Sequence, residues 1–281
     1  MTSSLLLSVV TFILLGAALC YCGGWLFRRE LLGKIATGIA WMGLIVLTVG
    51  LVLRWVESYR LGIGHAPLSN FYESLVFGAW SVVLVYLIME IRYRSRALGV
   101  FPLALAFLAM AYASFSPGME SQIQPLIPAL KSNWLIAHVI TCFLGYAAFA
   151  VASGIGILYL IKCRASASNN PGSSVLRRVP NIKTLDELIY QNVIFGFLLL
   201  SVGIITGAVW ANSAWGTYWS WDPKETWSLI TWLVYALMLH SRLVRGWHGP
   251  RMAWLSIIGF ACVLFTYFGV NFLLSGLHSY A

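Results

Sequence analysis

The chain has 281 residues, of which 60% are hydrophobic and 10% are charged, and its formal net charge is +9. A soluble globular domain normally carries about 25% charged residues, so this composition, with a mean hydropathy of +0.82, excludes that class. We therefore expect an all-α, polytopic integral membrane protein.

Eight apolar segments are long enough to cross a bilayer, because a spanning helix needs roughly 17–25 residues. In chain order they cover residues 5–27, 35–55, 71–91, 100–115, 134–161, 188–209, 223–243 and 252–276. Residues 163–183 form the longest polar stretch and read as a flexible loop. With no internal repeat and no long hydrophilic insert, residues 1–281 are predicted to form a single integral membrane domain.

The basic residues have a topological pattern. Most of the 18 Lys and Arg lie in alternate connections, whereas Arg54, Arg60, Lys131 and Lys224 lie in the other connections. The positive-inside rule assigns the first set to the inner side, which puts the N and C termini on the outer, periplasmic or lumenal side. The positive charge is thus explained by membrane lipid and topology, and no nucleic acid partner is expected.

More than half of the 13 tryptophans fall between Trp210 and Trp247. One interpretation is an interfacial aromatic belt, in which each ring lies at headgroup depth. The density of rings around an acidic residue and a lysine favours a second interpretation, a platform for a large flat apolar ligand at the outer face. We assign this platform to residues 211–226. The residues in or next to it that we expect to contact the ligand are Trp215, Gly216, Trp219, Trp221, Asp222, Pro223, Lys224 and Trp227.

A helix start is predicted inside this segment. Asp222 suits the N-cap, Pro223 the first helical position, and Glu225 the position from which a side chain reaches back to the cap. The seventh span should therefore begin at Pro223.

Three histidines are candidate ligands. His138 lies one turn into the fifth span and His278 follows the eighth, so both should flank the platform. His240 lies 13 residues beyond Trp227, which is roughly 20 Å along a helix and places it nearer the inner face. A structural histidine is the alternative for each, but an ionisable group within a span is costly and is a functional candidate. His65 is interpreted as structural or solvated.

Imidazoles beside an aromatic surface suit haem, because imidazole nitrogens ligate its iron and the rings receive the porphyrin. Lys224 is the first candidate to meet the propionates, with Lys131 and Arg60 as weaker ones. Closely spaced Cys and His ligands are missing, which disfavours structural zinc. The five cysteines form no C-x-x-C-H motif, so the chain is not itself expected to carry covalently bound haem.

The string WGTYWSWDPKETWSLITW resembles the tryptophan-rich "WWD" signature of haem-handling proteins in cytochrome c maturation. The segments GHAPLSNFYESL, WLIAHVITCFLGYAAF and GVNFLLSGLHSY extend the resemblance over roughly residues 60–281. Eight spans and a C-terminal histidine are more similar to the CcsA (ResC-type) family than to CcmC and CcmF, which carry the same platform.

This resemblance implies that His138 and His278 hold haem b as a substrate at the platform and that His240 receives haem from the inner side. It implies a CcsB (ResB/Ccs1-type) partner, thiol-reducing pathway proteins, and delivery of haem to apocytochrome c for thioether attachment. The membrane would be a bacterial plasma membrane or a thylakoid membrane. The family's part would be that of a component in a cytochrome c synthase (haem lyase) complex, without a catalytic residue of its own.

Two other functions would require different patterns of residues. A membrane b-type haem protein that transfers electrons predicts paired histidines at equal depth, and His240 has no such partner in this sequence. A transporter for another substrate predicts inverted repeats and broken helices at mid-membrane, and no repeat is seen.

Overall fold

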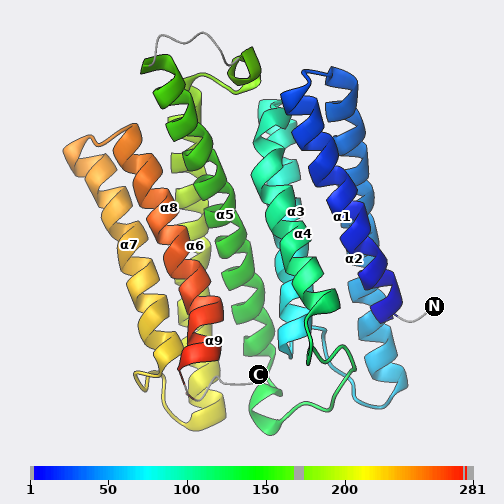
Figure 1. Cartoon of the computed structure of the whole chain (residues 1–281). Helices are drawn as coiled ribbons and strands as arrows, with labels where there is room; N and C mark the ends of the chain where they lie inside the picture. Colours follow the sequence, from blue (N-terminus) through cyan, green and yellow to red (C-terminus); the bar gives the residue numbers. More distant parts are fainter. Residues whose placement is uncertain (1–2, 168–173, 275, 277–281) are drawn as a thin grey trace. The chain divides into compact units, whose positions relative to one another are not determined.

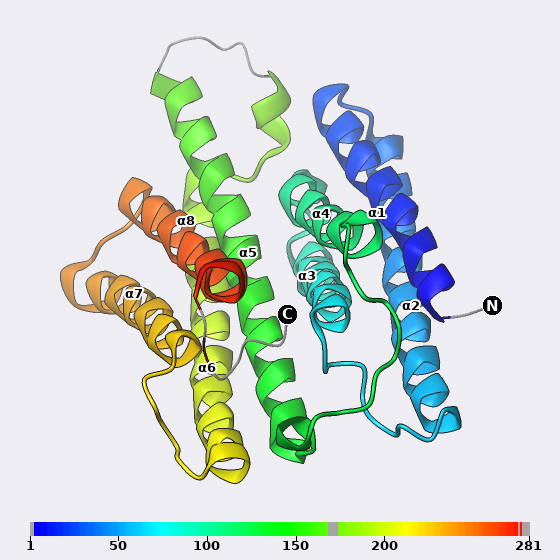
Figure 2. The same cartoon turned by 60° about the horizontal axis from the view of Figure 1, so that its bottom comes forward.

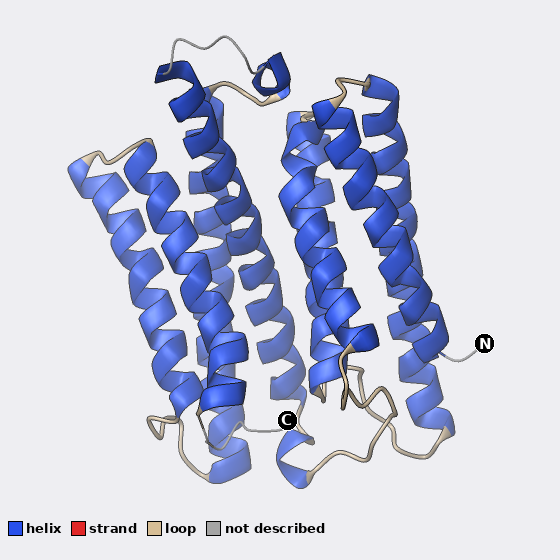
Figure 3. Ribbon diagram, viewed as in Figure 1, coloured by secondary structure: helices blue, strands red, loops and turns tan. Residues whose placement is uncertain are grey.

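The computed structural model describes residues 3–167, 174–274 and 276 (Figure 1). Helices and their connections make up these ranges, and no strand occurs in them (Figure 3). Eight of the described helices are long and apolar enough to cross a membrane. The predicted all-α fold and the number of spans are confirmed, and the chain is an integral membrane protein.

The chain divides into two compact units, Met1–Ile127 and Pro128–Ala281. The prediction that residues 1–281 act as a single membrane domain stays a prediction. The first unit is an up-and-down bundle in which successive helices pack on each other and the first also packs on the fourth. Its elements are α1 (Ser3–Leu26), α2 (Glu30–Arg60), α3 (Phe71–Tyr93), the short η1 (Arg96–Gly99) and α4 (Val100–Phe115).

The second unit is built around a long antiparallel pair, α5 and α6, which make its most extensive contacts. Small residues allow this approach, since a Cβ built on Gly145 would lie 3.0 Å from the carbonyl oxygen of Gly196. Its elements are η2 (Pro128–Leu130), α5 (Asn133–Ala167), η3 (Ser174–Arg178), α6 (Ile182–Trp215), α7 (Pro223–Arg245), α8 (Pro250–Leu264), the π-helical turn η4 (Phe265–Gly269) and α9 (Val270–Leu273).

Several helices are longer than the predicted apolar segments: α2 covers Glu30–Arg60 instead of 35–55, and α5 ends at Ala167 instead of residue 161. Two further differences concern α6 and the last span. Helix α6 begins at Ile182 instead of residue 188, because Asn181 caps it by accepting a hydrogen bond from the Thr184 N–H at 2.8 Å. The eighth span is continuous to Leu273 but contains the π-helical turn η4, which the apolar pattern did not predict. Turns of this kind are often found at functional sites.

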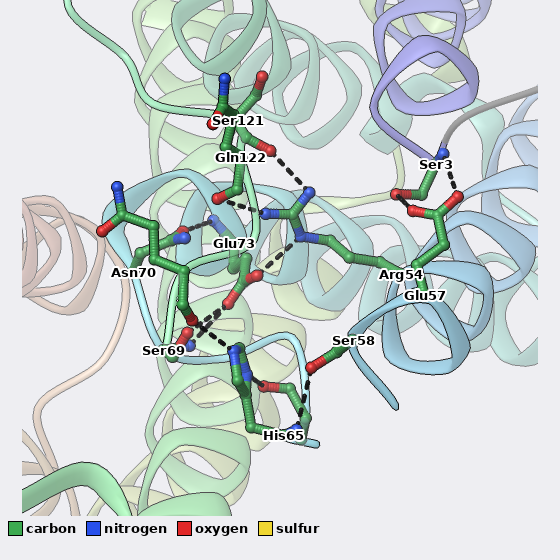
Figure 4. A network of polar contacts seen from close by, with 12 residues as sticks. Ser3, Arg54, Glu57, Ser58, His65, Ser69, Asn70, Glu73, Ser121 and Gln122 are labelled. Atoms are coloured by element: carbon green, nitrogen blue, oxygen red, sulfur yellow. Dashed lines mark hydrogen bonds and ion pairs between the residues drawn. The ribbon is translucent and has the colours of Figure 1, made fainter. Parts of the chain in front are cut away.

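A buried ion pair organises one end of the first unit (Figure 4). Arg54 of α2 is 2% exposed and donates from Nε to Glu73 of α3, itself fully buried, at 2.7 Å. Its other nitrogens donate to the carbonyl oxygens of Ser121 at 2.8 Å and Gln122 at 3.3 Å. Glu73 also accepts from the Ser69 backbone at 2.9 Å. The arrangement ties the connection after α4 to α2 and α3.

His65 belongs to the same end of this unit. Its backbone N–H donates to the Ser58 hydroxyl at 3.0 Å, and its ring nitrogens lie 2.8 Å from the Ala66 carbonyl oxygen and 3.0 Å from that of Gln124. With 6% of its surface exposed, His65 is a buried residue that joins two connections. These contacts support the structural interpretation given to it from the sequence.

A second buried ion pair lies in the other unit, at the end where α6 begins. Arg242 donates to Asp186 at 2.8 Å and to Glu187 at 3.2 Å. Asp186 also accepts from the Gly249 N–H at 2.7 Å, so α6, α7 and the turn before α8 are joined.

Candidate functional site

The platform segment occupies the end of the second unit where α6 ends and α7 begins. Helix α6 ends at Trp215, and Gly216 caps it with φ +80, donating its N–H to Asn212 at 2.9 Å. A left-handed cap of this kind favours glycine, which carries no Cβ. Figure 2 brings this end forward and shows the connection that runs from α6 to α7.

The predicted start of α7 is confirmed. Asp222 is its N-cap and Pro223 its first residue, and the Asp222 side chain accepts from the Lys224 N–H at 3.1 Å. In return, Glu225 accepts from the N–H of Asp222 at 3.2 Å and from that of Ser220 at 2.8 Å. This capping box fixes the chain on both sides of Asp222, and with it the direction in which α7 leaves the platform.

The tryptophan rings meet in two edge-to-face pairs. Trp210 and Trp215 have centroids 4.9 Å apart at 60°, and Trp219 and Trp221 have centroids 5.6 Å apart at 88°. Within each pair the two indole planes are therefore steeply inclined to each other and are not coplanar. Trp221 is 69% exposed and has φ +60, an uncommon backbone conformation for a residue with a Cβ.

Trp219 carries a buried donor. Its Nε1 is shielded from solvent, and no acceptor among the described residues lies within hydrogen-bonding distance. A buried N–H without an acceptor costs about 1–3 kcal/mol. A ligand that brings an oxygen acceptor to this position would offset that cost, which is the chemistry of a carboxylate side group on an otherwise apolar molecule.

His138 lies on α5 beside the last turns of α6. It is half-buried, its Nδ1 lies 2.7 Å from the carbonyl oxygen of Gly203, and its ring stacks on Trp210 with centroids 5.9 Å apart at 24°. Trp210 is fixed in turn, because its Nε1 donates to the carbonyl oxygen of Ala129 at 2.8 Å. The histidine is thereby joined through Trp210 to the aromatic group that leads into the platform.

Trp227 connects the platform to the last span. Its ring lies 4.1 Å from that of Phe265, the first residue of η4, measured between centroids. Its carbonyl oxygen accepts from the hydroxyls of Thr231 at 2.8 Å and Thr266 at 3.2 Å. The π-helical turn thus lies directly against the first turns of α7.

The chain returns to the platform after α9. A Cβ built on Gly276 would lie 3.0 Å from Pro223 Cδ and would also meet the carboxylate of Asp222. Gly276 stands two positions before His278 in the sequence. His278 itself lies outside the described residues.

The other predicted site residues are distributed along α7. Lys224 lies half-buried in the first turn, next to Asp222, whereas His240 lies 13 positions beyond Trp227 on an exposed face. The described structure therefore brings His138 and the tryptophans to one end of the second unit and keeps His240 apart from them.

The sequence matches the family described as "Cytochrome C assembly protein" over residues 68–278, which is most of the chain. The chain belongs to this family. The "Cytochrome c biogenesis protein CcsA" of Gloeobacter violaceus is 42% identical, covering 90% of this chain and 88% of the relative. That of Guillardia theta is 41% identical, covering 96% and 94%, and that of Synechococcus elongatus is 41% identical, covering 95% and 94%. The resemblance to CcsA inferred from the tryptophan motif is confirmed.

A solved structure has a similar fold. The chain named "Cytochrome c Heme Lyase CcmF" superposes with a TM-score of 0.68 at 17% identity, covering 99% of this chain. The match covers 48% of that chain, so the present chain spans about half its length. At this identity the similarity concerns the fold alone.

Sequence reasoning missed the surroundings of His138. Gly203 and Gly207 of α6 both lie against α5, and a Cβ on Gly207 would lie 2.6 Å from Nδ1 of the histidine. The signal in the sequence is two glycines four positions apart, the second of them three positions before Trp210. Without the pairing register of the helices, this pattern could not be assigned to a partner.

Proposed function

We propose that this chain takes part in cytochrome c maturation by holding haem at the platform and presenting it for covalent attachment to apocytochrome c. The observation that carries the proposal is His138, an imidazole fixed at Nδ1 and placed on the ring of Trp210 at the platform end of the second unit. The family match supports a role in cytochrome c maturation, and the residues at the platform support haem as the substrate.

The groups at this end suit haem. A porphyrin is large, flat and apolar, and aromatic rings contribute contact area for it. His138 provides an imidazole for iron. Two groups suit the carboxylates of haem. The shielded Nε1–H of Trp219 is a donor without an acceptor among the described residues, and Lys224, at the start of α7, is a cation. Haem b, as substrate, accounts for all of these groups together.

His278 is proposed as the second axial ligand at the platform. Gly276 lies against Asp222 and Pro223, so the described chain leads back to the platform two positions before this histidine. Two imidazoles from separate segments would hold haem by its iron and leave the vinyl edge available to a substrate protein.

The attachment itself needs no nucleophile from this chain. Each thiol of an apocytochrome c C-x-x-C-H motif adds across a vinyl group of haem: a C–S bond forms, the thiol proton ends on the neighbouring carbon, and no net electron is gained or lost. The residues of this chain contribute proximity and orientation. The chain is in this sense a component of a cytochrome c synthase complex, with thiol-reducing proteins keeping the cysteines of the apocytochrome reduced.

His240 is proposed to receive haem within the membrane, together with a CcsB-type partner. It lies on an exposed stripe of α7 with Leu233, Leu237 and Val244, which are 52%, 57% and 68% exposed. An imidazole on such an apolar surface is unfavourable in lipid unless another polar group meets it. A partner helix that brings a second histidine would satisfy it and would complete an inner haem site.

The orientation follows the charge pattern. We assign both termini and the platform to the outer side, because the more basic connections belong inside. The membrane is proposed to be a bacterial plasma membrane or a thylakoid membrane, where c-type cytochromes act on the outer or lumenal side.

The experiment measures the haem bound to three proteins, each purified with its partner: the unmodified chain and two histidine variants. His138→Gly should lower the haem absorbance per protein by about 10-fold. His248→Gly is the control and should leave it unchanged, because His248 is exposed and its ring contacts only the carbonyl oxygen of Gly246, in its own turn, among the described residues. Equal haem in all three proteins would refute a role for His138 in holding it.

A further inference from the structure

Three residues on one face of α6 surround the ring of His138. Gly203, Gly207 and Trp210 are spaced by four and three positions, so they lie on the same side of the helix. All three approach the histidine: the first through its carbonyl oxygen, the second at the position that a Cβ would occupy, and the third by ring stacking.

The contact with Gly203 selects one form of the imidazole. A carbonyl oxygen only accepts, so at 2.7 Å the Nδ1 of His138 must be the donor and carry the proton. In a neutral ring the lone pair is then on Nε2. A hydrogen bond from the other ring nitrogen to a carbonyl is the usual device that orients a metal-binding histidine.

Gly207 leaves no room for a side chain. A Cβ built there would lie 2.6 Å from Nδ1, 2.8 Å from Cε1 and 3.4 Å from Cγ of His138, so its three nearest atoms outside the helix's own backbone belong to one ring. Gly203 differs, because a Cβ at that position would meet Cys142 and Thr141 of α5. Gly203 is thus also a helix-packing glycine, whereas Gly207 accommodates the imidazole specifically.

We propose that Gly207 is a positioning residue for haem ligation: it admits the His138 ring against α6, where the Gly203 carbonyl holds Nδ1–H and Nε2 becomes the atom that binds iron. The inference rests on the proposed function, since it names the ligating atom of the same site. A methyl group at position 207 would push the ring from the Gly203 carbonyl and turn Nε2 away from its place.

The test is a double-mutant cycle with added imidazole. Gly207→Ala, His138→Gly and the combined variant are purified with the partner, and haem content, the haem spectrum and protein level in the membrane are measured with and without imidazole. Gly38→Ala serves as the control, because Gly38 is also in a helix and a Cβ there would meet no atom within 4 Å.

Gly207→Ala should lower haem content about 10-fold, as loss of an orienting contact does at metal sites, and its spectrum should show loss of one axial ligand. In the His138→Gly background the added methyl group should not change the protein level, because the ring it would strike is gone. It should instead reduce rescue by imidazole about 10-fold, because it occupies the place that the free imidazole needs. The control should behave as the unmodified chain.

Three results would overturn the inference. Normal haem content and spectrum in Gly207→Ala would show that the ring tolerates the methyl group. If imidazole rescued His138→Gly equally well with Gly or with Ala at position 207, the space beside Gly207 would not be the one that the ligating ring occupies. This comparison tests the inference even if the Gly207→Ala variant alone fails to accumulate. Full haem content in His138→Gly would refute the proposed function itself, and the inference with it.

Discussion

Replacing Arg54 by Met should destabilise the first unit strongly. The guanidinium is 2% exposed, pairs with a fully buried Glu73 at 2.7 Å, and supplies hydrogen bonds to two carbonyl oxygens of the connection after α4. Methionine keeps an unbranched apolar stem of similar length but removes every donor. Among the described residues, the Glu73 carboxylate would then keep only the hydrogen bonds that it accepts from the backbone N–H and the hydroxyl of Ser69.

The expected cost follows from these contacts. Removing one partner of a buried ion pair costs about 3–5 kcal/mol, because the other charge stays buried without compensation. At roughly 2–4 °C per kcal/mol, which is the shift usual for domains of about 150–250 residues, the midpoint of thermal unfolding should fall by about 6–20 °C. Adding Glu73→Leu removes the uncompensated carboxylate and should restore part of this loss, though not the donors to Ser121 and Gln122.

The assay is thermal unfolding of the purified protein in detergent. Arg60→Met is the matched control, because Arg60 lies on the same helix but is exposed. A midpoint for Arg54→Met within about 1 °C of the control would refute the reasoning, since surface changes fall within about 0.5 kcal/mol. So would a further loss of stability on adding Glu73→Leu.

Three other predictions concern the platform, the membrane site and the topology. Trp219→Phe keeps an aromatic ring but loses the buried donor, so it should lower haem retention about 10-fold or more, because a hydrogen bond to a charged group contributes about 1.5–3 kcal/mol. Trp221→Phe should lower haem retention less, and equal losses from the two variants would point to ring size alone. His240→Ala should lower the haem that co-purifies in the presence of the partner, whereas His248→Ala should not, and equal loss from both would contradict the assignment of His240. A reporter fused at Arg94 should respond on the inner side and one after the last residue on the outer side; an inner C-terminus would contradict the topology.

Much of the fold could be predicted because it depends on local rules. A bilayer needs apolar runs of a minimum length, so the sequence predicts all eight spans, although several helices extend beyond the apolar runs. The start of α7 was predicted to the residue, because a capping box requires only Asp222, Pro223 and Glu225 within four positions. The aromatic cluster was recognised from its density alone.

The remainder depends on contacts between distant segments. Arg242 was counted as a topological charge, but it is 8% exposed and paired with Asp186, which lies 56 positions away. Hydropathy also places the start of α6 too late, because the polar residues of its first turns are tolerated where α7 supplies an ion-pair partner, as Arg242 does for Asp186. The carbonyl that holds His138 also comes from another helix, at Gly203, and no local pattern gives that pairing.

The central claim is that His138 and His278 hold haem by its iron at the platform, and it is tested most directly by imidazole rescue of cytochrome c assembly. The measurement is the yield of covalently haem-bearing cytochrome c in cells carrying His138→Gly or His278→Gly, with and without added imidazole, at matched protein level. The account predicts near-complete loss of yield for each variant and partial recovery with imidazole, because the free ring can occupy the vacated coordination position. Loss of yield that imidazole does not relieve for either variant, with haem content unchanged, would contradict ligation and leave both histidines with structural roles.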